Sequence, residues 1–217
     1  MSRLRLNKIA TPATPAAGKG ELFYSSTLSP NVLAWTDEIG KPARVGGIYA
    51  SGATGAVGGG FAADTYISGS SINIGTVGAW KAGMVYRAVF DMVKTAAGTA
   101  TPIIVLRMGT AGTTADAAIV TFTFSAGTAA ADTGIFVVEA EFRSVGSGTS
   151  AVVAGVATCN HQLASTGLVS TAASGLQVLP VAGAGFDSTI SNIIGVSFNG
   201  GASFVGTNVM SDAYLLS

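Results

Sequence analysis

Four apolar segments between Met84 and Phe142 decide the fold class of this chain: MVYRAVFDMVK (84–94), TPIIVLRMGT (101–110), AAIVTFTF (117–124) and GIFVVEAEF (134–142). Each segment has the length of a β-strand, and a link rich in Gly, Thr and Ala separates it from the next. In the last segment every second residue is apolar: Phe136, Val138, Ala140 and Phe142. The residues between them become acidic toward one end. This period of two predicts an antiparallel sheet with one face packed on a core.

Further strand-like patterns lie on both sides of this stretch. They occur at 65–67, 71–74, 150–163, 175–180, 188–198 and 207–216. No stretch with a helical period extends beyond about ten residues. The sequence therefore predicts an all-β fold, an antiparallel, jelly-roll-like β-sandwich over residues 64–217.

A glycine-rich segment, ASGATGAVGGG (50–60), lies before the predicted sandwich. It lacks the GK[ST] ending of a phosphate loop and the GxGxxG spacing of a dinucleotide site, and no helical pattern follows it. We interpret residues 46–63 as a linker or surface loop.

Residues 1–45 differ from the rest because they are locally basic and hold four of the six prolines. The prolines predict an extended arm. Residues 21–24 and 32–35 then form a predicted β-ribbon, with Ser29-Pro30-Asn31 as its turn. A lone hairpin is marginal in water, so this one must lie on its own domain, on other copies of the chain or on a partner. The candidate partner-binding residues of this arm are Arg3, Arg5, Lys8, Phe23, Tyr24 and Trp35.

The composition narrows the class of partner. The chain has 217 residues, a formal net charge of +0, and a charged fraction of 10%, against about 25% in ordinary soluble domains. Zero net charge gives no bulk attraction to nucleic acid. The mean hydropathy is +0.53, yet there is no uninterrupted apolar run of about 20 residues, so we expect no membrane contact. The start of the chain, MSRLRLNKIA, does not resemble a secretory signal.

Few residues are candidates for chemistry. Cys159 is the single cysteine and cannot form an intramolecular disulfide, so we expect a packed thiol. His161 is the single histidine. A triad with Ser165 and a distant aspartate is conceivable, but no nucleophile elbow is present, and we interpret His161 as a structural or surface residue. We expect Trp80 and Trp35 to pack in a core or an interface rather than to stack on sugars.

Two sets of carboxylates remain. Asp116 and Asp132 lie in predicted hairpin loops, where a hydrogen-bonded turn aspartate is commoner than a calcium ligand. Glu139 and Glu141 lie on one strand face, a pairing that a glycosidase can use. Arg143 continues that face and favours an ion-pair ladder. We therefore predict no catalytic residue, no metal and no cofactor, and expect the chain not to be an enzyme.

From Ser144 to Ser217 the only charged side chains are Asp187 and Asp212. Obligate interfaces are poor in charge and resemble a core cut in half. This segment therefore predicts a tight homo-oligomer whose copies cover it.

The pieces KTAAGTATP (94–102), RMGTAGTTAD (107–116) and AADTG (130–134) resemble β-sandwich domains of tailed-bacteriophage virion proteins. Residues 15–42 are similar to anchor segments of phage fibres. The resemblance implies a homotrimeric jelly roll, fixed by its N-terminal arm to the outer surface of a virion through the major capsid protein or another virion protein. It implies a capsid decoration (cement) or head-fibre protein. The alternative is a tail fibre or receptor-binding protein that recognises a bacterial surface glycan. A glycan-degrading enzyme is a more distant third possibility.

Overall fold

The structure is a computed structural model that describes residues 8–9, 21–25, 33–36, 42–44, 48–74, 79–170 and 176–216. It divides into two compact units, one formed by Met1–Ala50 with Ser217 and the other by Ser51–Leu216. Every regular element among the described residues is a strand, which confirms the all-β prediction. The described residues contain no helix, and so none that would cross a membrane.

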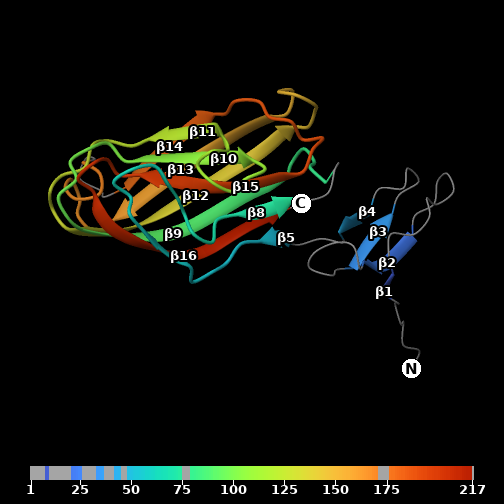
Figure 1. Ribbon diagram of the computed structural model, residues 1–217, viewed down its shortest axis with the longest axis horizontal. Coiled ribbons are helices and arrows are strands. Elements are labelled where there is room, and N and C mark those ends of the chain that lie inside the picture. The colour runs from blue at the N-terminus through green and yellow to red at the C-terminus, as the bar shows by residue number, and fades with distance from the viewer. Residues whose placement is uncertain are drawn as a thin grey trace. The chain divides into compact units, whose positions relative to one another are not determined.

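The first unit contains a small sheet in the order β1-β2-β3-β4 (Figure 1). Its strands are β1 (Lys8–Ile9), β2 (Glu21–Ser25), β3 (Leu33–Thr36) and β4 (Pro42–Arg44). The predicted ribbon is present, because β2 pairs antiparallel with β3. The predicted turn at 29–31 lies outside the described residues. Two further strands, β1 and β4, were not predicted from the sequence.

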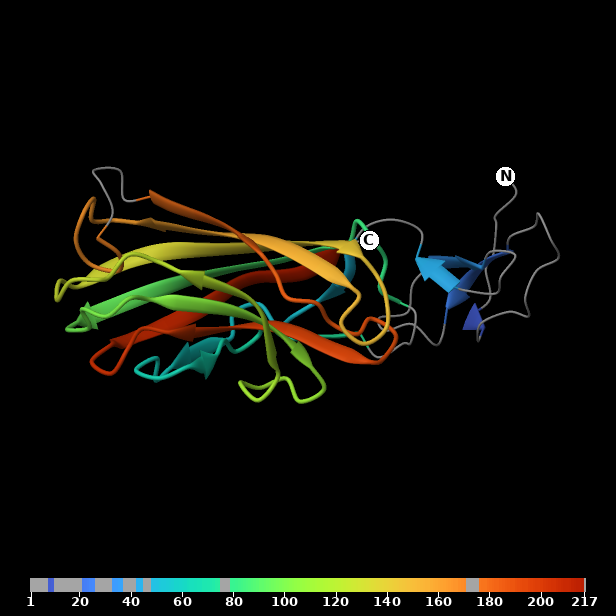
Figure 2. The same ribbon diagram turned by 90° about the horizontal axis from the view of Figure 1, so that it is seen from above.

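The second unit is a β-sandwich of two sheets packed face to face (Figure 2). The smaller sheet has the order β11-β10-β15-β7, with β8 also paired to β15. Its strands are β7 (Thr65–Tyr66), β8 (Ile72–Ile74), β10 (Ile103–Gly109), β11 (Ala117–Thr123) and β15 (Asn192–Asn199).

The larger sheet has the order β14-β13-β12-β9-β16-β5, with β6 also paired to β16. Its strands are β5 (Ile48–Ser51), β6 (Val57–Gly59), β9 (Val85–Ala96), β12 (Asp132–Ser144), β13 (Val152–His161), β14 (Leu176–Ala182) and β16 (Val205–Leu216). The boundary between the two units falls inside β5.

The eight longest strands pair in a nested way that is typical of a jelly roll. The first, β9, pairs with the last, β16, and the second, β10, pairs with the seventh, β15. The two middle strands, β12 and β13, form a hairpin. Strands β11 and β14 lie beside each other without a ladder, joined where Ser125 N donates to Gln177 Oε1 and Ala184 N donates to Ile119 O. A ladder between β9 and β12 completes the larger sheet.

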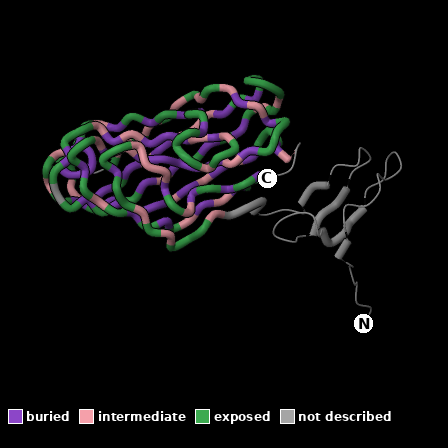
Figure 3. The backbone as a smooth tube through the Cα atoms, in the orientation of Figure 1, coloured by how far each residue is buried: buried purple, intermediate pink, exposed green. Residues whose placement is uncertain are grey.

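The core is aromatic and lies between the two sheets, and buried stretches recur along the strands of the second unit (Figure 3). Phe136 of β12 stacks on Phe90 of β9 at 5.4 Å between ring centroids. It also meets Phe124 and Phe198 edge-on, at 5.4 and 5.6 Å, from the side of the smaller sheet. Phe136 therefore joins both sheets. The predicted alternation on β12 is confirmed, since every residue of its apolar set is buried.

The segment 46–63 was expected to be a linker or surface loop, but its described residues, 48–63, contain strands as well as loops. It contains β5 and β6, and β6 pairs with β16. Phe61 is fully buried and meets Phe198 edge-on at 5.5 Å. The glycines misled the interpretation, because here they let the strand approach its neighbours: a Cβ on Gly58 would lie 2.4 Å from Oδ1 of the buried Asn208.

Candidate functional site

Three ionisable side chains are buried together at one end of the sandwich: Lys94, Asp132 and His161. They come from the neighbouring strands β9, β12 and β13. Lys94 lies opposite Asp132 in the β9–β12 ladder, and His161 lies opposite Gly134 in the β12–β13 ladder. Each one continues the inward face of its strand at the point where the apolar residues end. We call this group the polar end cluster.

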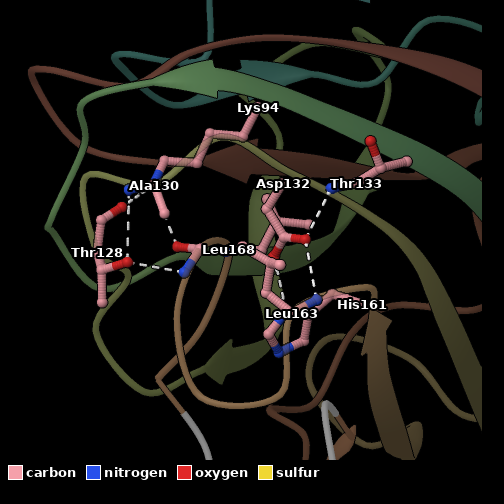
Figure 4. Close-up of polar contacts among 9 residues, drawn as sticks. Lys94, Thr128, Ala130, Asp132, Thr133, His161, Leu163 and Leu168 are labelled. Atoms are coloured by element: carbon pink, nitrogen blue, oxygen red, sulfur yellow. Dashed lines mark hydrogen bonds and ion pairs between the residues drawn. The ribbon is translucent and has the colours of Figure 1, made fainter.

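Asp132 is the centre of the polar end cluster (Figure 4). Its Oδ2 lies 2.6 Å from Nδ1 of His161 and accepts from Leu168 N at 2.9 Å. Its Oδ1 accepts from Thr133 N at 2.8 Å and from Leu163 N at 3.3 Å. A carboxylate that accepts several bonds in an apolar surrounding holds its partners strongly. Asp132 therefore fastens the segment 162–170 over the end of the sandwich.

Lys94 completes this arrangement from the opposite strand. Its Nζ donates to the carbonyl oxygen of Thr128 and, at 3.1 Å, to that of Gly167. Burial lowers the pKa of Lys94 below its ordinary value, and the nearby Asp132 carboxylate opposes that change. Two carbonyl oxygens thus take the place of the water molecules that would solvate the Lys94 ammonium group at the surface.

Two glycines allow the close packing around Asp132 and His161. A Cβ on Gly134 would lie 2.8 Å from Cβ of His161 and 2.8 Å from Cδ1 of Leu168. A Cβ on Gly167 would lie 2.2 Å from Oδ2 of Asp132, and its φ of +100° is one that L-residues rarely adopt. Neither position tolerates a side chain without moving the carboxylate or the imidazole.

The chemistry open to His161 follows from its burial. Both side chains of the Asp132–His161 pair are 0% exposed, whereas Ser165 lies on the surface. Nε2 of His161 is buried and has no hydrogen-bond partner among the described residues. The structure thus places His161 as a structural histidine. Sequence reasoning missed its pairing with Asp132 and the part played by Lys94; the one signal was that the inward face of β9 ends in a lysine.

The outer face of the larger sheet carries the paired glutamates. Glu139 forms an ion pair with Arg87 across the β12–β9 ladder, at 2.9 Å, and Arg87 lies 5.9 Å from the ring centre of Tyr214. The ion-pair ladder expected among Glu139, Glu141 and Arg143 is therefore replaced by a single pair with Arg87. Glu141 and Arg143 form no ion pair among the described residues. An open depression of about 330 Å³ adjoins the pair; its polar side chains are Glu139, Glu141 and Arg143.

Asp116 is a turn aspartate, as the sequence predicted. Its side chain accepts from the backbone of Ala111 at 3.0 Å and of Gly112 at 2.7 Å. The neighbouring Arg107 donates to the carbonyl oxygen of Asp116 at 2.7 Å and forms an ion pair with Asp64. The described residues contain no group of three or more His, Cys, Asp or Glu side chains placed to hold a metal ion.

The other residues considered from the sequence lie in the core. Trp80 packs against Phe142 and Phe186, with ring centroids 4.6 and 5.6 Å away. Cys159 is a free, buried thiol, as predicted. Burial raises the pKa of Cys159 to about 12, and the Asp132 carboxylate adds to the effect.

This raised pKa predicts alkaline destabilisation. Below pH 9 the thiol keeps its proton in both states; above the ordinary value of 9.0 the unfolded chain loses it and the folded chain holds it until about pH 12. We expect Cys159 to lower the free energy of unfolding by about 1 kcal/mol between pH 9 and pH 10. Denaturant titrations under reducing conditions should show a steeper decline for the wild type than for Cys159→Ala. Equal slopes would contradict the prediction.

The arm residues proposed to bind a partner are only partly located. Lys8, Phe23, Tyr24 and Trp35 lie on β1, β2 and β3, where the backbone alone is described. Lys8 lies opposite Tyr24 in the parallel β1–β2 pair, and Trp35 lies opposite Leu22. Arg3 and Arg5 lie outside the described residues.

Comparisons with protein-family models, with curated proteins and with solved structures found no match to this chain.

Proposed function

We propose that this chain is a structural protein on the outer surface of a bacteriophage particle, of the capsid-decoration or head-fibre type. In this proposal the sandwich associates with copies of itself, and the N-terminal unit binds the major capsid protein or another virion protein. Arg3, Arg5 and Lys8 supply positive charge for that contact, together with Phe23, Tyr24 and Trp35.

The observation that carries the proposal is where the exposed apolar side chains lie. The described residues include eleven exposed large hydrophobic side chains, and eight of them fall in the charge-poor segment 144–217: Val145, Val152, Leu176, Val178, Ile190, Val205, Val209 and Leu216. Part of the low charge has another cause, since β15 is almost wholly buried. The exposed part of segment 144–217 is apolar and poor in charge, which is the composition of a surface that other proteins cover. The resemblance of residues 94–102, 107–116 and 130–134 to β-sandwich domains of tailed-bacteriophage virion proteins adds the virion context.

Deleting residues 2–44 tests the anchoring role. We expect the truncated chain to keep its far-ultraviolet circular dichroism spectrum, because β5 and the sandwich remain, and to be lost from purified particles. Quantitative blotting of particles that carry the full-length or the truncated chain measures this. Wild-type amounts of the truncated chain on particles would overturn the anchoring role, and electron microscopy of the labelled full-length chain distinguishes head from tail.

The second candidate is a receptor-binding protein that holds a bacterial surface glycan. The depression beside Glu139, Glu141 and Arg143 favours it, because carboxylate and guanidinium groups can hydrogen-bond to sugar hydroxyls. Its lining includes no aromatic ring for sugar stacking, which places this function second. Loss of glycan-array binding in Glu141→Gln, with retention in Asp187→Asn, would favour it.

A further inference from the structure

An unusual apolar band crosses the outer face of the larger sheet. It consists of six exposed side chains: Val57 (65% exposed), Val93 (38%), Ile135 (50%), Leu176 (45%), Val178 (52%) and Val209 (38%). We call these six residues the apolar belt. Outward faces of sheets in monomers are ordinarily polar, so a row of this kind requires an explanation.

The ladder registers place four of the belt residues in one row across six strands, with Asp91 and Asn160 between them. Val57 of β6 lies opposite Val209 of β16, which lies opposite Asp91 of β9. Asp91 lies opposite Ile135 of β12. Ile135 in turn lies opposite Asn160 of β13, and Asn160 lies opposite Leu176 of β14. Val93 and Val178 each lie two residues further along their strands and so on the same face. They lie on opposite sides of this row, because β9 and β14 run in opposite directions.

Charge is unevenly distributed over this face. The belt region contains two carboxylates. The Oδ1 of Asp91 accepts a hydrogen bond from Val209 N, and Asp212 of β16 lies opposite Val89, in the cross-strand row that contains Val178. The charged residues Arg87, Glu139, Glu141 and Arg143 lie at the other end of β9 and β12. The belt therefore offers no basic group to an acidic partner, and only these two carboxylates to a basic one. A second apolar, β-branched sheet face matches it, because such faces pack by interdigitating their side chains.

The size of the belt fits a contact between two copies. Six strands at about 4.8 Å spacing span roughly 24 Å, and the belt with its margins extends roughly 20 Å along the strands. Two such faces would bury on the order of 1,000 Å² in total, near the lower limit for a specific interface. The chain has a formal net charge of +0, so long-range repulsion does not oppose self-association.

We propose that the apolar belt is the surface through which one copy of this chain binds a second copy, sheet face against sheet face. This inference rests on the self-association contained in the proposed function and assigns it to a particular surface. It moves the contact from the charge-poor segment 144–217 as a whole to one face, to which β6, β9 and β12 also contribute. An interface of this size lies near the lower limit for specific contacts, so we expect the association to be weak.

Sedimentation equilibrium of the full-length protein from about 1 to 100 µM tests the assignment. We expect the wild type to self-associate, and Ile135→Lys and Val178→Lys to raise the dissociation constant by about tenfold or more. The matched control is Ile190→Lys, which places the same charge at a side chain that is 45% exposed. It lies in the loop where Ser188 contacts Gly146, beyond the far end of β12, and should associate like the wild type.

A cross-linking experiment keeps the test valid if a lysine variant fails to fold. Ile135→Cys should form a disulfide-linked dimer on mild oxidation, and Ile190→Cys should not. The native Cys159 is buried, so it does not contribute a competing cross-link. Association that persists unchanged in both lysine variants would overturn the proposal. So would a wild type that is monomeric at 100 µM, in which case another virion protein is the candidate occupant of the belt. Neither result bears on anchoring by residues 2–44, which the particle assay measures separately.

Discussion

Replacing Asp132 with alanine is expected to lower the free energy of unfolding by about 3–5 kcal/mol, the range found when one partner is removed from a buried charge pair. The substitution leaves His161 Nδ1 and the backbone N–H groups of Leu163 and Leu168 without their acceptor. It also leaves Lys94 buried without a nearby opposite charge. Urea titrations followed by circular dichroism, at one fixed protein concentration, measure the change.

Asp187→Ala is the matched control for this substitution. Asp187 also accepts a backbone hydrogen bond, from Thr189 at 2.8 Å, but it does so on the surface. We expect its removal to lower the free energy of unfolding far less than the removal of Asp132 does. Asp132→Asn should fall between the two variants, because one side-chain oxygen remains as an acceptor. An effect of Asp132→Ala no larger than that of Asp187→Ala would show that the polar end cluster does not hold the 162–170 segment in place.

Phe136→Ala is expected to have an effect of comparable size, about 3–5 kcal/mol of lost unfolding free energy. The ring is fully buried and contacts Phe90 in its own sheet and Phe124 and Phe198 on the opposite side. Its removal leaves a cavity between the two sheets, where the packing on both sides limits collapse. Thermal and urea unfolding of the purified variant measure the loss.

Thr133→Ala controls for the effect of altering β12 itself. Thr133 is exposed and lies three residues before Phe136, on the outer face of the same strand. We expect the free energy of unfolding to change by at most about 0.5–1 kcal/mol. If the two variants were equally stable, Phe136 would not be the contact that joins the sheets.

The strand positions were largely predictable because the signal is local. On β12 the alternation of Phe136, Val138 and Phe142 with outward residues is visible in the sequence, and a core on one side is enough to explain it. The same rule failed for residues 46–63. Glycine carries no apolar side chain and therefore no alternation, so β6 was invisible until its pairing with β16 was known.

The contacts of the candidate sites were not predictable, because they join residues that are distant in the chain. Asp132 and His161 are 29 residues apart, and each one alone resembles a loop or surface residue. The apolar belt likewise draws on β6, β9, β12, β14 and β16, and no single strand contributes more than two of its side chains.

By itself, the sequence determined that this protein is an all-β sandwich poor in charge, with a basic, proline-bearing segment before it. Periodicity and composition show which residues face the core and which face solvent, and this preference is a local property of each segment. Only the tertiary structure decided that Lys94, Asp132 and His161 close one end of the sandwich, and that six exposed apolar residues lie on the outer face of the larger sheet. Strand order and ladder register create those neighbourhoods, and they arise from long-range pairing that no single segment encodes.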